Sequence, residues 1–252
     1  MPTCPAGETR KPSPAALGDG TPADYASSVE FSPSRRRLAV VASLALLSAL
    51  AAAMVVARIL YTGETTYANL LWNLALAWIP LLLALFVYDA ARRGAGRLRV
   101  WGGGLAWLLF FPNAPYLMTD FQFLRDWSTA PIWYDVVLLS AAAWTGLTLG
   151  FASLYLVHTV ARRWLGPASV WAGVAVVLAL TSFGIYLGRF ERWNSWDVVS
   201  RPGPLLNSIV DRVTDPDPRT AGVTAVFTAF LALAYAAFYS VVRLGVVERP
   251  PA

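Results

Sequence analysis

Three aspartates lie in polar stretches that interrupt an otherwise apolar chain. Asp120 ends "FFPNAPYLMTD", Asp135 ends "IWYD", and Asp197 ends "GRFERWNSWD", which also contains Arg189. Paired carboxylates can act as general acid and base, or hold Mg²⁺ or Ca²⁺ through oxygen ligands. An arginine guanidinium can bind phosphate or carboxylate with two parallel hydrogen bonds. The three stretches therefore predict a polar site, provided that the fold brings them together.

The side chains that we expect in such a pocket combine carboxylates, guanidinium groups, amides and aromatic rings. The candidate ligand-binding residues are Asn113, Tyr116, Asp120, Asp135, Arg189, Arg192, Trp193, Asn194, Trp196 and Asp197. A second interpretation needs no ligand, because tryptophans also gather in the headgroup region of a bilayer as an aromatic belt. Asp135 can likewise be stabilised by the dipole at the start of a helix.

Pro112 and Pro115 stand inside the first of these stretches. Each proline removes a backbone donor and so frees carbonyl groups that hydrocarbon cannot satisfy. The simpler outcome is a kinked end to a short helix, with Asn113 bonding the freed groups. The alternative is an unwound helix end that exposes carbonyls and Asp120 to a small cavity, as in discontinuous transporter helices. The sequence leaves both open.

The composition indicates that these residues lie in a membrane protein. The chain of 252 residues is 57% hydrophobic and 14% charged, and its mean hydropathy is +0.52. The formal charge of +5 comes from arginines clustered between apolar runs, which is how membrane spans are oriented, so we exclude nucleic-acid binding. The single cysteine, Cys4, and the single histidine, His158, cannot build a disulfide or a zinc cluster. We expect His158 at the membrane interface.

The predicted fold is an all-α polytopic transmembrane helix bundle of about six spans. A span needs about 20 apolar residues, and the candidates are 38–60, 70–88, 98–118, 132–157, 170–187 and 223–247, the third and fifth being short or interrupted. Residues 1–34, rich in Pro, Ala, Gly and Ser, are expected to be a disordered cytoplasmic tail, and 35–252 the transmembrane domain. Between spans 5 and 6, "PLLNSIVDRV" has the spacing of a short interfacial helix.

Arginine bias predicts the orientation of the bundle. Basic clusters precede span 1, separate spans 2 and 3 and spans 4 and 5, and follow span 6. Such clusters stay in the cytoplasm, so both termini are expected there and all three polar stretches on the outer face. Their convergence on that face is what predicts a pocket.

Two glycine pairs have small-xxx-small spacing. They are Gly146 with Gly150 and Gly184 with Gly188. Small residues let helix backbones approach closely where lipid supplies no hydrophobic drive. We favour packing within one chain over dimerisation as their role.

The polar stretches also resemble signature segments of a bacterial integral-membrane family called domain of unknown function 1361. The resemblance covers about residues 38–247, and it implies a multi-pass inner-membrane protein without implying an activity. It singles out Pro112, Asn113, Pro115, Tyr116, Asp120, Asp135, Arg189, Trp193, Asn194, Ser195, Trp196 and Asp197. Many members carry histidine where this chain has Phe123, so no histidine-dependent metal or acid/base role is implied there.

Three functions remain open from the sequence. The favoured one is binding or transport of a small polar solute or a lipid headgroup by a protein embedded in the bilayer. The second is a membrane-embedded enzyme that acts on lipid-linked or envelope substrates through paired carboxylates. No nucleophile elbow, phosphate-binding glycine loop or zinc motif supports it. The third is an assembly partner of another envelope protein. No cofactor and no metal ligand set is identified.

Overall fold

The computed structural model describes residues 33–124, 129–215 and 217–247, and these residues form helices and connecting loops without a strand. The chain divides into two units, residues 1–42 and 43–252. Only the first turns of one helix are described in the first unit, so all packing below belongs to the second. The tail predicted for residues 1–34 lies, up to residue 32, outside the described part.

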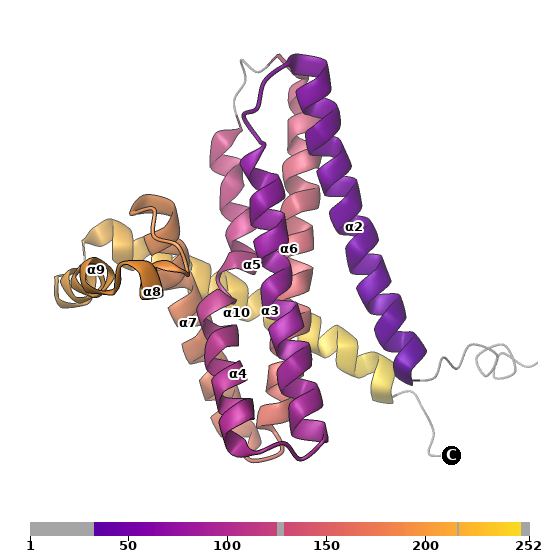
Figure 1. The fold of residues 1–252 in the computed structure, drawn as a ribbon, viewed down its shortest axis with the longest axis vertical. Helices are drawn as coiled ribbons and strands as arrows, with labels where there is room; N and C mark the ends of the chain where they lie inside the picture. Colours follow the sequence, from indigo (N-terminus) through magenta and orange to yellow (C-terminus); the bar gives the residue numbers. More distant parts are fainter. Residues whose placement is uncertain (1–32, 125–128, 216, 248–252) are drawn as a thin grey trace, which may run out of the picture. The chain divides into compact units, whose positions relative to one another are not determined.

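Two groups of short helices separate the long ones (Figure 1). The long helices are α2 (Pro33–Thr62), α3 (Asn69–Arg92), α6 (Ile132–Ala161), α7 (Pro167–Phe190) and α10 (Pro218–Val247). The short ones are α4 (Arg97–Phe110), α5 (Asn113–Tyr116), the 3₁₀ helix η1 (Leu117–Phe123), α8 (Asp197–Ser200) and α9 (Pro202–Thr214). The five long helices are apolar and long enough to cross a bilayer. The all-α membrane bundle is thus confirmed.

The third expected span, 98–118, is not one helix but the series α4, α5 and η1. We call residues 97–123 the broken segment. It packs along α3, and α5 and η1 also pack on α6. The Tyr67 hydroxyl, just before α3, donates to the Phe123 carbonyl at the end of η1 (3.1 Å). The broken segment therefore returns the chain to the end of the bundle where α3 began (Figure 1).

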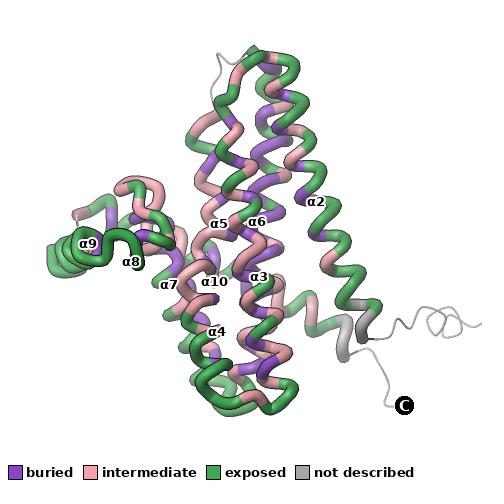
Figure 2. Tube along the Cα trace, in the orientation of Figure 1, coloured by how far each residue is buried: buried purple, intermediate pink, exposed green. Residues whose placement is uncertain are grey.

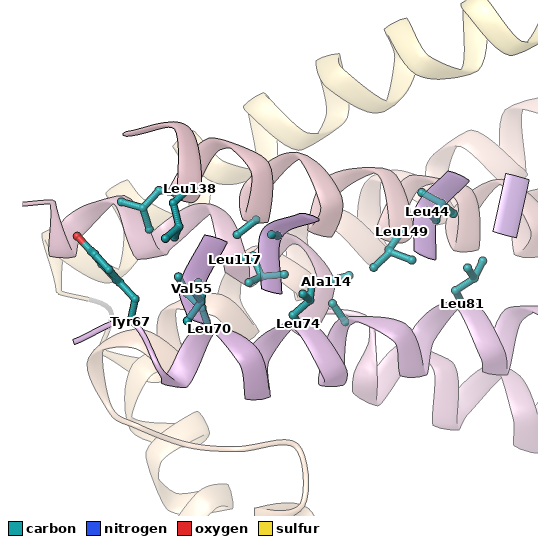
Figure 3. Packing of buried hydrophobic residues seen from close by; sticks show 14 residues of the cluster. Leu44, Val55, Tyr67, Leu70, Leu74, Leu81, Ala114, Leu117, Leu138 and Leu149 are labelled. Atoms are coloured by element: carbon teal, nitrogen blue, oxygen red, sulfur yellow. The ribbon is translucent and has the colours of Figure 1, made fainter. Parts of the chain in front are cut away.

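The main core lies between α2, α3, α6 and the broken segment. Leu138 and Leu149 of α6 are fully buried in one cluster with Leu74 of α3, and the broken segment contributes Ala114 and Leu117 (Figure 3). Figure 2 shows buried positions along α6, whereas α10 is mostly exposed. The broken backbone is thus packed in protein, as it must be where no water can satisfy it.

A second core joins α6, α7 and α10, and it contains the histidine. His158 is buried, with Nδ1 3.1 Å from the Tyr235 hydroxyl and its ring stacked on Tyr239. Trp171 meets the imidazole edge-on. His158 lies in the last turn of α6, and aromatic rings cover its side chain, which periodicity does not reveal.

The two glycine pairs hold the broken segment from opposite sides. A Cβ on Gly146 would lie 2.3 Å from the Ala114 carbonyl oxygen, and one on Gly150 would lie 3.3 Å from Ala114 Cβ. On α7, a Cβ on Gly184 would lie 3.2 Å from the Pro112 ring and one on Gly188 3.2 Å from the Tyr116 ring, both closer than an ordinary contact. The predicted packing within one chain is confirmed at all four glycines.

Candidate functional site

The break between α4 and α5 begins where the prolines change the pattern of backbone hydrogen bonds. Pro115 has no N–H for the Phe111 carbonyl, so Ala114 N–H donates to it instead (3.2 Å). The Phe110 carbonyl is therefore left without the Ala114 N–H, and it accepts from Asn113 Nδ2 instead (3.0 Å). Backbone dihedrals from Pro112 to Leu117 stay in the right-handed helical region. The segment is therefore kinked and tightened, not unwound, and Asn113 bonds a freed carbonyl as the kinked alternative predicted.

Ser195 ties a distant loop to this break. Asn113 Nδ2 also donates to Ser195 Oγ (3.0 Å), and Ser195 Oγ donates to the Leu109 carbonyl (3.2 Å). The loop between α7 and α8, residues 191–196, is thus fixed to the broken segment by one serine and one asparagine. Two of the three polar stretches of the sequence converge here.

A pocket of about 420 Å³ lies beside this junction. Its walls come from α3, α4, α5, α7, the α7–α8 loop, α8 and α9 and are mainly apolar. The apolar lining residues are Leu76, Leu108, Leu109, Leu180, Phe183, Leu187, Val198, Leu205, Ile209 and Val213. Polar groups come from Asn73, Asn113, Tyr116, Trp193, Asn194 and Ser195. An apolar cavity with a few polar groups is the usual form of a ligand site.

The rim of the pocket is itself apolar. Trp72 is 59% exposed, Leu180 50% and Val213 65%. Leu180 lies in α7 and Trp72 in α3, both helices that can cross a bilayer. The opening is therefore bordered by side chains suited to hydrocarbon.

Glu191 attaches helix α9 to the end of α7. Its carboxylate accepts from Ser208 Oγ (2.7 Å), from Arg212 Nε (2.5 Å) and from Trp193 Nε1 (3.3 Å). Burial acts to raise the pKa of Glu191, but these hydrogen bonds and the Arg212 charge outweigh it and hold the pKa below its ordinary value. The ionised carboxylate thus keeps α9 over the pocket.

Asp197 organises the loop rather than facing a ligand. Its buried carboxylate accepts from the Asn194 backbone N–H (2.8 Å), from Ser200 Oγ (2.9 Å) and from Arg201 Nη2 (3.1 Å). The Asn194 N–H and then the other donors lower the pKa of Asp197. It therefore stays ionised and holds the turn that leads into α8.

Arg192 stands out in this loop by its backbone. Its φ is +61°, and it is the one non-glycine residue with positive φ in the described chain. Such a conformation costs an L-residue about 1–2 kcal/mol. Its side chain is exposed and forms no ion pair with a described residue.

Asp120 and Arg189 form a buried ion pair behind the Tyr116 wall of the pocket. Arg189 Nη2 lies 2.5 Å from Asp120 Oδ1, and Nε donates to Thr119 Oγ1 (2.8 Å). The guanidinium lies 4.3 Å from the centre of the Tyr116 ring and 5.3 Å from that of Phe123. The charges neutralise each other, and neither residue lines the pocket.

Asp135 belongs to a different cluster. Its fully buried carboxylate accepts from Arg58 Nε (2.7 Å) and Nη2 (3.2 Å), and the Tyr67 ring lies under the same guanidinium. Asp135 thus pairs with Arg58, whereas Asp120 pairs with Arg189. Arg58 was missed; a lone arginine inside the apolar run of span 1 was the available signal.

The structure thus divides the ten predicted site residues into groups. Asn113, Tyr116, Trp193 and Asn194 line the pocket. Asp120, Arg189 and Asp197 support its walls, Trp196 packs edge-on against the Trp72 rim (6.4 Å), Arg192 is exposed beside it, and Asp135 lies elsewhere.

Several pocket residues were not predicted. Asn73 had a signal, an amide inside the apolar run of α3, and Ser195 stands in the polar stretch "GRFERWNSWD" and among the residues of the family resemblance. The leucines of the pocket walls gave no signal in the sequence, because their pattern is that of ordinary lipid-facing residues.

No group of three or more His, Cys, Asp or Glu side chains that could hold a metal ion occurs among the residues described. Each of the three aspartates is instead held by its own arginine, Asp120 by Arg189, Asp135 by Arg58 and Asp197 by Arg201.

The model of a family described as "Protein of unknown function (DUF1361)" matches residues 72–234. The chain belongs to this family. The matched range begins at the Trp72 rim and includes every residue that lines the pocket, whereas Arg58 lies outside it. No curated protein and no solved structure matches the chain.

Proposed function

We propose that this membrane protein binds a lipid-type ligand, with one hydrocarbon chain in the pocket and a polar head at the α7–α8 loop. The observation that carries this proposal is a mainly apolar pocket whose polar groups are contributed by Asn113, Asn194 and Ser195 near the helix break. A small polar solute fits these leucine-rich walls less well, because it would lose its hydration without gaining enough hydrogen bonds.

The size of the pocket supports a single chain. A methylene group is close in volume to a water molecule, roughly 30 Å³, so 420 Å³ accommodates one chain of about a dozen carbons. A chain that leaves lipid for this pocket stays in an apolar environment and gains little hydrophobic free energy. The affinity must therefore come from packing against the walls and from the polar head.

The apolar rim supports entry from the bilayer. Trp72 and Leu180 border the opening on helices that can cross the membrane, so a chain can pass between lipid and pocket without meeting water. We place the protein in the bacterial cytoplasmic membrane with both termini in the cytoplasm, as the arginine clusters predict. The pocket then lies toward the outer leaflet.

Carboxylate catalysis has less support. Asp120, Asp135 and Asp197 are each engaged by an arginine, and none of them lines the pocket. A general acid or base must reach the proton that it transfers. Binding is therefore the function that the geometry favours.

A pair of variants on one helix tests the proposal. Leu109→Trp places an indole in the pocket, whereas Leu105→Trp, one turn earlier, adds the same group at a side chain that is 71% exposed. We expect native mass spectrometry of the purified proteins to show a retained lipid in wild type and Leu105→Trp. Leu109→Trp should retain at least roughly tenfold less, a loss of about 1.4 kcal/mol. Equal retention in all three samples would contradict the proposal.

A further inference from the structure

We propose that the head of this ligand carries a phosphate ester, bound at the mouth of the pocket by Arg192 and Arg201. The inference rests on the proposed function, since it names the class of molecule that the same pocket takes. It is carried by two arginines beside the pocket residue Trp193, both with unused hydrogen-bond donors.

Arg192 is the first of these cations. It directly precedes residues 193–195, which line the pocket, and its exposed guanidinium pairs with no carboxylate among the described residues. No hydrogen bond with a described residue occupies a donor of this side chain, so its guanidinium can bind a ligand. Guanidinium groups match phosphate oxygens with two parallel hydrogen bonds.

Arg201 is the second cation, and it is already held in position. Its guanidinium lies 5.2 Å from the centre of the Trp193 ring, and Nε and Nη2 both donate to Asp197 Oδ1. Its side chain remains 60% exposed. Within the described chain no bond occupies Nη1, so this nitrogen can donate to a ligand oxygen without releasing Asp197.

The acidic residues of the loop do not oppose an anion. Glu191 is occupied by Arg212, Ser208 and Trp193, and Asp197 by Asn194, Ser200 and Arg201. Both carboxylates are thus turned toward donors of the protein. Arg192 is left as the cation of the loop without a counter-ion in the described chain.

The backbone of Arg192 adds an independent observation. A φ of +61° is costly for arginine and would be free for glycine. Residues held in such conformations concentrate at functional sites. A ligand contact gives this strained arginine a role.

Two probes isolate the phosphate. Farnesyl phosphate and farnesol share one hydrocarbon chain and differ in the phosphate group, so the ratio of their dissociation constants in one detergent measures phosphate recognition alone. We expect wild type to bind farnesyl phosphate at least tenfold more tightly than farnesol. Inorganic phosphate should not displace farnesyl phosphate at equal concentration; displacement would overturn a lipid-borne phosphate as the ligand.

The decisive variant is Arg192→Gly, because glycine accepts φ = +61° and preserves the loop. It should bind farnesol as wild type does, melt at the same or a higher temperature, and lose most of the preference for phosphate. Arg192→Lys should keep part of that preference. The matched control is Arg219→Gln, which removes an exposed arginine stacked on Phe190 and should change neither constant.

These experiments distinguish a failure of the proposed function from a failure of the phosphate inference. If wild type binds neither probe, the proposed pocket function fails with the inference. If wild type binds both probes equally, or if Arg192→Gly keeps the full preference for phosphate, the phosphate inference is wrong and the apolar pocket stands.

Discussion

At the residue scale, the charged side chains near the pocket mostly hold the fold rather than wait for a substrate. Asp120 and Arg189 are both buried and bonded to each other, and their pair fixes η1 to the end of α7. Removing one partner of a buried pair leaves an uncompensated charge, which is costlier than removing both.

A double-mutant cycle tests this view of the pair. Asp120→Ala and Arg189→Ala should each lower the free energy of unfolding by about 3 kcal/mol or more, measured in one detergent. The double variant should lose less than the sum, with a coupling of roughly 1–3 kcal/mol. Strictly additive losses would show that the two side chains do not interact.

Acid should loosen α9 from the end of α7. Because the pKa of Glu191 is lowered in the folded protein, its stabilising contribution is present above the ordinary glutamate pKa of about 4.3. It is lost as the pH falls through the lower folded pKa, and the same sign holds for Asp197. The contribution of Glu191 should be below about 1 kcal/mol, since its partner Arg212 is partly exposed.

The measurement is the melting temperature against pH for wild type and Glu191→Gln. Wild type should be the more stable near neutral pH, and the difference should shrink as the pH falls below about 4.3 and vanish below the lower pKa of Glu191 in the folded protein. A difference that stays constant across the titration would contradict the role of ionised Glu191.

At the scale of elements, the broken segment is what creates the site. Its prolines were visible in the sequence and correctly predicted a kink. The N–H that a proline lacks affects only hydrogen bonds within its own turn, so the sequence alone reveals the effect. The partner that satisfies the Leu109 carbonyl, Ser195, comes from a loop far along the chain. Local chemistry could not identify it.

The glycines that seat the broken segment give the sharpest prediction at this scale. Gly146→Ala should cost about 1–3 kcal/mol or more, because its Cβ would meet the Ala114 carbonyl oxygen, a backbone atom that cannot move aside cheaply. Gly173→Ala on α7 has open space around it and should be neutral or slightly stabilising. Equal melting temperatures of the two variants in detergent would argue against this packing.

At the scale of the whole molecule, hydropathy predicted the helices well and the pocket only in part. The five long helices follow from apolar length alone, and the amphipathic α9 from its spacing. Arginine bias predicted that separated polar stretches meet, and two of three do. Asp135 does not join them, because it binds Arg58 of α2. A pair so far apart in the chain produces no periodic pattern from which it could be predicted.

The topology provides a prediction of its own. If the broken segment counts as a crossing beside the five long helices, six crossings place both termini on one side of the membrane; five would place them on opposite sides. We expect reporter fusions to show both termini and the Arg92–Arg99 loop in the cytoplasm. A reporter at this loop that reads as outside would overturn the orientation.

The most direct test of the central claim is electron cryo-microscopy of the protein in lipid nanodiscs, bound to an antibody fragment to increase its size. We predict one elongated density between α4 and α7, entering past Leu180 and ending beneath the α7–α8 loop near Asn113 and Ser195. A pocket that is closed by its own leucine side chains, with lipid density only around the outer surface, would contradict the account.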